Sequence, residues 1–338
     1  MNQANDNPPA NTPSSSSSRR RFLQGGMALL LPAVGPAWSQ SSNVTRLIIP
    51  FTPGASNDII GRMIAEAVGK KTGRSWIVEN KAGAGSMLGA DFVAKAAPDG
   101  QTLLLCATAN MGVLPAIQKS MPYAVEKDFT FFVRVASTPY ALTVNSQSKI
   151  SNFAEFLALA KAKPGSIRIG ASGVGALDYM GASMLQSQLG LDLNIVPYKG
   201  MSPVLNDLRG GHIDASIVSP ATIRPLAQDG RVRVLAVLDR KRSDLFPSVP
   251  SSVDLGYPQL LAINWYGIAG PARIQPAVVT SLRQALMGVL ADPDFTKSMK
   301  ERGFDLAVQS GDEFTQFVLE DLKRWKAVAK QGNITVDS

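Results

Sequence analysis

The stretch that most constrains this chain is residues 46–70. Residues 47–49 form a short apolar run that ends at Pro50, and Pro53 with Gly54 gives a turn signal. Polar residues at 56–58 then precede apolar residues that recur at helical spacing, which predicts an amphipathic helix. The stretch is therefore predicted to be a strand, a tight loop and a helix N-terminus, the repeating unit of α/β sheets.

A second unit of the same kind begins at residues 167–171 and continues through a Gly-rich turn at 172–175. Helix N-termini present unpaired backbone N–H groups and the positive end of the helix dipole, so each unit is suited to bind an anionic group. Every α/β sheet contains such units, so one of them alone is weak evidence. Asp178 lies in the first turn of the second helix, where it either complements the dipole or accepts a hydrogen bond from a ligand.

Length and residue usage narrow the possibilities. A chain of 338 residues is longer than one core usually supports, which predicts two lobes. The alternation of apolar runs and helical patterns predicts parallel sheets covered by helices. Cys106, the single cysteine, excludes an internal disulfide and reads as a buried apolar side chain. His212, the single histidine, argues against a histidine triad, and we expect no metal and no cofactor.

The first 39 residues have the pattern of an export signal. Arginines at 19–21 precede Phe22, an apolar stretch follows at 27–34, and small residues occupy positions 37 and 39. The paired arginines resemble a twin-arginine signal, and the apolar stretch is too short to span a bilayer. The mature protein is therefore predicted to be periplasmic. Beyond residue 40 no basic run with interleaved aromatics occurs, so we expect no nucleic-acid partner.

Six short motifs occur in order along the mature chain. They are Pro-Phe-Thr-Pro-Gly at 50–54, Val-Glu-Asn-Lys-Ala-Gly-Ala-Gly at 78–85, Ala-Lys-Ala-Ala-Pro-Asp-Gly-Gln-Thr-Leu at 94–103, Ala-Lys-Ala-Lys-Pro-Gly at 160–165, Val-Pro-Tyr-Lys-Gly at 196–200 and Trp-Tyr-Gly at 265–267. With these motifs, residues 46–333 resemble the Bug family, the periplasmic solute receptors of tripartite tricarboxylate transporters.

The resemblance implies an α/β, two-lobe periplasmic-binding-protein fold of type II-like arrangement, with two crossover strands and a ligand cleft between the lobes. It places lobe 1 at 44–140 and 260–338, and lobe 2 at 141–259. It also implies a monomer that is not an enzyme. Such a receptor captures a small carboxylated solute by lobe closure and delivers it transiently to the permease subunits in the membrane.

The residues that the resemblance and the two units assign to the ligand lie in loops that follow strands. They are Phe51, Thr52, Gly54, Ala55, Ser56, Asn57, Asp58, Thr108, Asn110, Ser172, Gly173, Val174, Gly175, Ala176, Asp178, Tyr198 and Ser219. Residues 54–58 and 172–175 would supply backbone N–H donors to the carboxylate. Thr52, Thr108, Asn110, Tyr198 and Ser219 would add side-chain hydrogen bonds or cavity wall.

The chain departs from the family pattern at several of these positions. Ala55 replaces a usual glycine, and Asp178 stands where histidine is frequent. Small polar residues are usual at the positions of Val174, Ala176 and Leu177, and the turn Ser219-Pro220 replaces one that usually bears Asn or Asp. The lobe 2 side of the pocket is therefore predicted to be less polar. It also gains a possible negative charge at Asp178. These departures disfavour a small dicarboxylate as the solute, and they favour an aromatic or amide-bearing monocarboxylate or an amino acid, between which the sequence does not choose.

An exported, nucleotide-cofactor-dependent oxidoreductase is the alternative. Glycines at 83, 85 and 89 follow a predicted strand and open a helix, as in a dinucleotide fingerprint. The acidic residue that should end the next strand is absent, so we interpret these glycines as turn and close-packing positions. Arg62 and Glu66 are expected to pair on a helix face, and Trp265 and Tyr266 to be hinge or cleft-wall residues.

Overall fold

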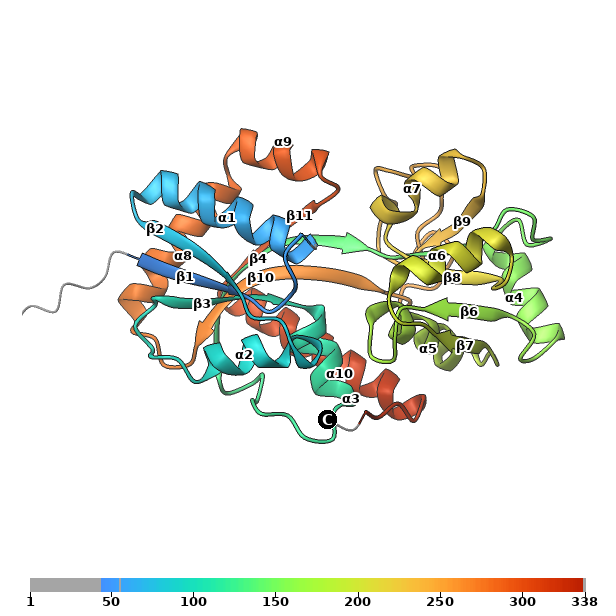
Figure 1. The fold of residues 1–338 in the computed structure, drawn as a ribbon, viewed down its shortest axis with the longest axis horizontal. Coiled ribbons are helices and arrows are strands. Elements are labelled where there is room, and N and C mark those ends of the chain that lie inside the picture. Colours follow the sequence, from blue (N-terminus) through green and yellow to red (C-terminus); the bar gives the residue numbers. More distant parts are fainter. Residues whose placement is uncertain (1–43, 55, 337–338) are drawn as a thin grey trace, which may run out of the picture. The chain divides into compact units, whose positions relative to one another are not determined.

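The computed structural model describes residues 44–54 and 56–336, which form two sheets flanked by helices (Figure 1). The predicted signal at 1–39 and the predicted ligand residue Ala55 lie outside the described residues. The first sheet has six strands in the order β11-β4-β10-β3-β1-β2. Their bounds are β1 Val44–Ile49, β2 Ser75–Asn80, β3 Thr102–Ala107, β4 Phe129–Pro139, β10 Ile263–Pro271 and β11 Asp305–Ser310.

The second sheet has five strands in the order β7-β6-β8-β5-β9. Their bounds are β5 Ala141–Asn145, β6 Arg168–Ala171, β7 Asn194–Pro197, β8 Ala215–Val218 and β9 Val232–Val237. Helices α4 Phe153–Ala162, α5 Leu177–Leu189, α6 Met201–Gly210 and α7 Pro220–Gln228 accompany this sheet. The first sheet is accompanied by α1 Ser56–Thr72, η1 Ala84–Ser86, α2 Met87–Ala94, the π-helix η2 Ala109–Val113, α3 Leu114–Ile117, α8 Pro276–Leu290, α9 Pro293–Glu301 and α10 Asp312–Gln331.

Both sheets are mixed, so the prediction of parallel sheets was wrong in part. β1 runs parallel to β2 and β3, and β6 runs parallel to β7 and β8. β10 is antiparallel to β3 and β4, and β5 is antiparallel to β8 and β9. A parallel neighbour requires a helical crossover within one sheet, whereas β4 and β10 carry the chain from one sheet to the other.

Alternating side chains of the first sheet reach two different cores. Leu47 and Ile49 of β1 belong to a cluster with α1, α8 and α9, whereas Ile48 between them belongs to a cluster with α2 and α10. Leu103 and Leu104 of β3 divide in the same way. This period of two is what a strand that is buried on both faces requires, and it places helices on both sides of the sheet.

The chain passes between the sheets where three of its segments meet. The backbone N–H of Tyr140 donates to the Ala262 carbonyl at 2.8 Å, Leu238 N–H donates to the Tyr140 carbonyl at 2.8 Å, and Ala262 N–H donates to the Leu238 carbonyl at 2.9 Å. β4 ends just before this point in the first sheet, and β5 begins just after it in the second. The two-lobe fold is thus confirmed, while the lobe bounds at 140 and 260 stay a prediction.

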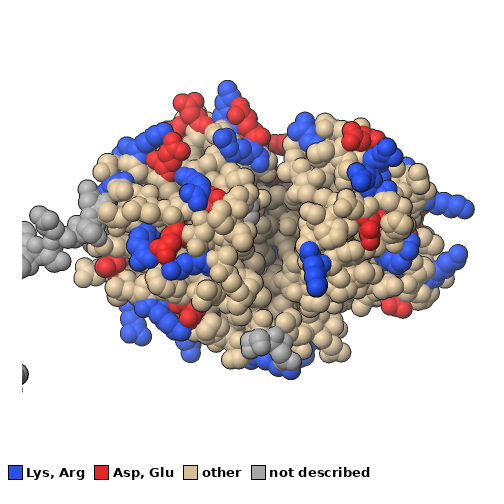
Figure 2. All heavy atoms as spheres, viewed as in Figure 1, with Lys and Arg blue, Asp and Glu red and all other residues tan. Residues whose placement is uncertain are grey.

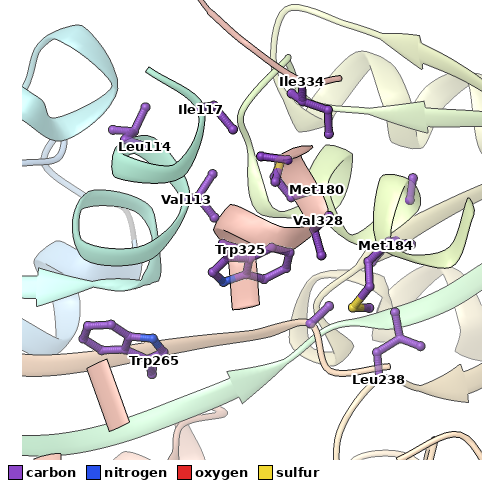
Figure 3. Packing of buried hydrophobic residues seen from close by; sticks show 14 of the residues in the cluster. Val113, Leu114, Ile117, Met180, Met184, Leu238, Trp265, Trp325, Val328 and Ile334 are labelled. Atoms are coloured by element: carbon purple, nitrogen blue, oxygen red, sulfur yellow. The ribbon is translucent and has the colours of Figure 1, made fainter. Parts of the chain in front are cut away.

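An apolar seam joins helices of the two lobes beside the crossover (Figure 3). Val113 and Ile117 of the first lobe, with Trp325 of α10, belong to the same buried cluster as Met180 and Met184 of α5. All five side chains are at most 2% exposed. Burying a large apolar side chain completely contributes roughly 1.5–3 kcal/mol to the free energy of folding, so the seam holds the two lobes together strongly.

Candidate functional site

The predicted ligand residues lie at the carboxyl ends of parallel strands in both sheets. The first loop, residues 50–54, follows β1, and Thr108 follows β3. The second loop, residues 172–176, follows β6 and leads into α5, while Tyr198 follows β7 and Ser219 follows β8. Crevices beyond the carboxyl ends of parallel strands are the usual ligand sites of open α/β sheets.

Asp58, which is 4% exposed, fixes the first loop from the first turn of α1. Its carboxylate accepts hydrogen bonds from Gly54 N–H at 2.9 Å, from Asn80 Nδ2 at 2.9 Å and from Arg62 Nε at 3.0 Å. Burial raises the pKa of Asp58, but these hydrogen bonds outweigh it and hold the pKa at about 2. Gly54 N–H, predicted to donate to the ligand, is therefore already bound within the protein.

The ion pair predicted between Arg62 and Glu66 does not form. Arg62 binds Asp58, and Glu66 accepts from Lys70 Nζ at 2.6 Å instead. Both pairs keep the favourable spacing of four residues on a helix, and Asp58 lies one turn closer to the N-terminus. Arg62 also donates to Asn80 Oδ1 at 2.9 Å, so it links α1 to the end of β2.

Asp178, which is 1% exposed, fixes the second loop in the way that Asp58 fixes the first. It accepts from Ser172 N–H at 2.6 Å, from Ser172 Oγ at 3.0 Å and from Tyr179 N–H at 2.9 Å. Burial raises the pKa of Asp178 despite these hydrogen bonds. Ser172 N–H is thus used internally, whereas the N–H groups of Gly173, Val174 and Gly175 donate to no acceptor among the described residues.

Thr108 and Asn110 are fully buried beside β10. Thr108 Oγ1 donates to the Ile263 carbonyl at 3.0 Å and accepts from Trp265 N–H at 2.9 Å, so it ties β3 to the returning crossover. Asn110 Oδ1 accepts from Ala107 N–H at 2.9 Å, and its Nδ2 has no partner in the described part of the chain. Asn110 lies in the π-helix η2, an irregularity that is frequent at functional sites.

The remaining predicted residues differ in how free their polar groups are. Tyr198 donates its hydroxyl to Asp207 Oδ2 at 2.6 Å, and Ser219 Oγ accepts from Thr222 N–H at 3.4 Å as the N-cap of α7. Phe51 is half-buried, and its carbonyl accepts from Asn80 Nδ2 at 3.1 Å. Thr52 and Ser56 are exposed, and the buried Oδ1 of Asn57 has no described partner. Ala176 is half-buried, and its N–H donates to the Gly173 carbonyl at 3.1 Å.

Tyr266 of β10, predicted from the sequence as a hinge or cleft-wall residue, lies behind these loops. Tyr266 is 2% exposed, and its hydroxyl accepts from Asn264 Nδ2 at 2.8 Å and lies near Ser56 of α1. Burial raises the pKa of Tyr266 to about 12, so it is a neutral donor at physiological pH. Tyr140 lies near both Asp178 and Tyr266. The Trp-Tyr-Gly motif was visible in the sequence, but nothing in it showed that Tyr266 reaches α1.

The second loop lies against the first lobe. Gly175 has a φ of +86°, and an added Cβ would lie 2.6 Å from Ile117 Cδ1 of α3. A side chain at this position would therefore separate the loop from α3. Figure 2 shows a hollow between the surface that carries α1 and the surface that carries α6, and its visible walls are mostly uncharged.

Comparison with known proteins decides the family. A model described as "Tripartite tricarboxylate transporter family receptor" matches residues 60–334. The chain belongs to this family. Protein BugT of Bordetella pertussis is 30% identical over 287 residues, which cover 85% of this chain and 88% of BugT. The Bug-family resemblance of the sequence is thereby confirmed.

Two relatives have been solved with carboxylates. A Rhodopseudomonas palustris protein with adipate is 26% identical, with a TM-score of 0.74, and the match covers 89% of this chain and all of that one. MatC from Rhodopseudomonas palustris, with bound malate, is 26% identical, with a TM-score of 0.69, and the match covers 84% and 98% of the two chains. The family is one of solute receptors and not a class of enzymes.

The glycines that suggested a dinucleotide fingerprint have structural roles in this receptor fold. Gly83 and Gly85 adopt φ values of +147° and +65° in the turn before α2. A Cβ at Gly89 would lie 2.7 Å from Pro50 Cβ and 2.8 Å from the Lys81 carbonyl, so α2 packs closely on the first loop. Among the described residues, no group of His, Cys, Asp or Glu could hold a metal ion, and no helix there is long and apolar enough to cross a membrane.

Proposed function

We propose that this receptor binds a small carboxylated solute between its two lobes, without covalent chemistry, for uptake by a tripartite transporter. The observation that carries the proposal is the pair of strand–loop–helix units whose loops are each held by a buried aspartate. In the second loop this arrangement leaves the N–H groups of 173–175 without acceptors among the described residues. A carboxylate would satisfy such N–H groups at the positive end of a helix dipole.

The contact between the second loop and α3 supports a site shared by both lobes. Gly175 approaches Ile117, and Tyr140 lies near Asp178 on one lobe and Tyr266 on the other. The neutral hydroxyls of Tyr140 and Tyr266 would donate to oxygens of the solute. Asn110 Nδ2, buried without a described partner, would supply a further donor.

We infer that Asp178 shapes the site from within the protein and does not contact the solute. Both of its carboxylate oxygens already accept hydrogen bonds from the second loop and from Tyr179. We therefore assign it to holding the loop in shape, which disfavours the alternative that it binds a ligand amine. The relatives with adipate and malate make dicarboxylates the first solutes to test here.

Export and delivery belong to the same proposal. The arginines at 19–21 and the apolar stretch at 27–34 support a cleaved, twin-arginine signal and a periplasmic mature protein. The permease subunits of a tripartite transporter would be its membrane partners, and the mature receptor would act as a monomer.

Native mass spectrometry of the purified mature protein, followed by thermal shifts with adipate, malate, hexanoate and an amino acid, tests the proposal. A ligand that binds the native state at a concentration of about 100 Kd stabilises it by roughly 2.7 kcal/mol, so one carboxylate should raise Tm clearly. A co-purified nucleotide or flavin, or no response to any carboxylate, would contradict it.

A further inference from the structure

A cavity of about 590 Å³ lies behind the crossover strands and away from the ligand loops. Its lining residues come from β4, β10, β11 and α10 of the first lobe, and from the segment after β9 of the second. None of the residues predicted to bind the solute lines it. The cavity is therefore distinct from the carboxylate site of the proposed function.

Arg134 of β4 is the central cation of this cavity. It is 9% exposed, and its guanidinium lies 4.0 Å above the ring of Phe317. Nη1 donates to the amide oxygen of Gln309 at 3.0 Å, while the buried Nε has no partner in the described part of the chain. No carboxylate of the described residues forms an ion pair with Arg134 within 4 Å, and the charges of Asp321 and Asp239 act on its guanidinium from farther away.

Two more cations reach the cavity from the second lobe. Arg240 and Lys241 are exposed, and neither forms an ion pair with a described residue. Burial lowers the pKa of Arg134 to about 10, which leaves it charged at physiological pH. With Arg324, which is paired with Asp321, four cations from both lobes line this cavity.

Three acidic residues also line the cavity, and they offset its four cations only in part. Asp321 is already paired, since it accepts from Trp265 Nε1 at 2.8 Å and from the Arg324 guanidinium. Glu320 is exposed at the rim. Asp239 accepts from the Arg240 N–H at 2.6 Å, and burial raises its pKa, although the charges of Lys241 and Arg134 act in the opposite direction.

We propose that this cavity is a second binding site, for a small oxyanion that contacts Arg134 on one lobe and Arg240 and Lys241 on the other. An arginine guanidinium matches the oxygens of a phosphate or carboxylate with paired donors. An anion bound in this way would bridge the lobes across the crossover strands. It would do so whichever solute binds at the ligand loops between the lobes.

Titration calorimetry of the mature protein with inorganic phosphate, and separately with acetate, tests the site and distinguishes the two sources of oxyanion. Arg134→Met keeps an apolar stem against Phe317 and removes the charge, and it should weaken binding about tenfold or more. Arg224→Met, an exposed cation on α7, is the control with the same change in net charge and should bind as the wild type does.

The double variant R240M/K241M alters only exposed side chains, so it keeps the test valid if Arg134→Met fails to fold. It should weaken binding of the same anion several-fold. Affinities equal to wild type in the folded variants would overturn the proposal, as would the absence of phosphate and acetate binding in the wild type. If instead the proposed carboxylate site at the ligand loops is wrong, the protein should bind phosphate but show no response to adipate or malate.

Discussion

At each of the two strand–loop–helix units, a buried aspartate in the first helical turn accepts a backbone N–H from the preceding loop. Asp58 binds Gly54 N–H, and Asp178 binds Ser172 N–H. The two carboxyls differ in their surroundings. Asp58 has Arg62 beside it, and its pKa is lowered, whereas Asp178 has no cation among its hydrogen-bond donors, and its pKa is raised. The contributions of the two aspartates to the free energy of unfolding should therefore change in opposite directions with pH.

Asp58 should make the fold sensitive to acid. The folded chain keeps Asp58 ionised down to about pH 2, whereas in the unfolded chain the same carboxyl takes up its proton near pH 3.8. Between these values the unfolded state binds more protons, so stability should fall as the pH falls. Urea unfolding from pH 5 to pH 2 should show a shallower decline for Asp58→Asn than for wild type. Parallel declines in the two proteins, with Asp229→Asn as an exposed control, would contradict this role.

Asp178→Asn should loosen the second loop and lower the affinity for every carboxylate ligand by a similar factor. An amide offers one acceptor and would direct an NH2 group at donors that now bind a carboxylate, so we expect a loss of about 1–3 kcal/mol in the free energy of unfolding. Urea unfolding and calorimetry with adipate and an amino acid measure the two effects. Unchanged stability with a reversed preference between these ligands would instead make Asp178 a ligand contact.

Among the elements, α5 has two tasks. Its N-terminus follows the second loop, and its middle packs into the seam with η2, α3 and α10. Met180 and Met184 supply unbranched side chains that fit irregular gaps between helices. The position of the second loop thus depends on packing one to two turns along the helix that follows it.

Met184→Ala should destabilise the protein by about 2–5 kcal/mol, because it opens a cavity in this seam. Met184 is 1% exposed. Leu88→Ala, which truncates a side chain that is 57% exposed, is the matched control and should cost far less. Differential scanning calorimetry compares the two, and equal changes in Tm would show that the seam contributes little.

At the scale of the whole molecule, the two lobes meet where Gly175 of the second loop lies against Ile117 of the first lobe. Gly175→Ala should weaken solute binding about tenfold or more, because the new Cβ both strains a positive φ and contacts Ile117 Cδ1. Ile117→Val removes that methyl group, so the double variant should recover part of the affinity. Calorimetry with the solute identified in the carboxylate screen measures both. No recovery in the double variant would assign the whole effect to backbone strain.

The sequence by itself determined the strand–loop–helix units, the two-lobe fold through its family motifs, and the burial of Cys106. These follow from local patterns: apolar residues at strand or helix spacing, and Gly or Pro at the turns. Tertiary structure decided the antiparallel strands β4 and β10, the pairing of Arg62 with Asp58, and the position of Tyr266 near Ser56. It also gathered Arg134 and Lys241 around one cavity. Such contacts join residues far apart in the chain or choose between equally spaced partners, and no local pattern encodes that choice.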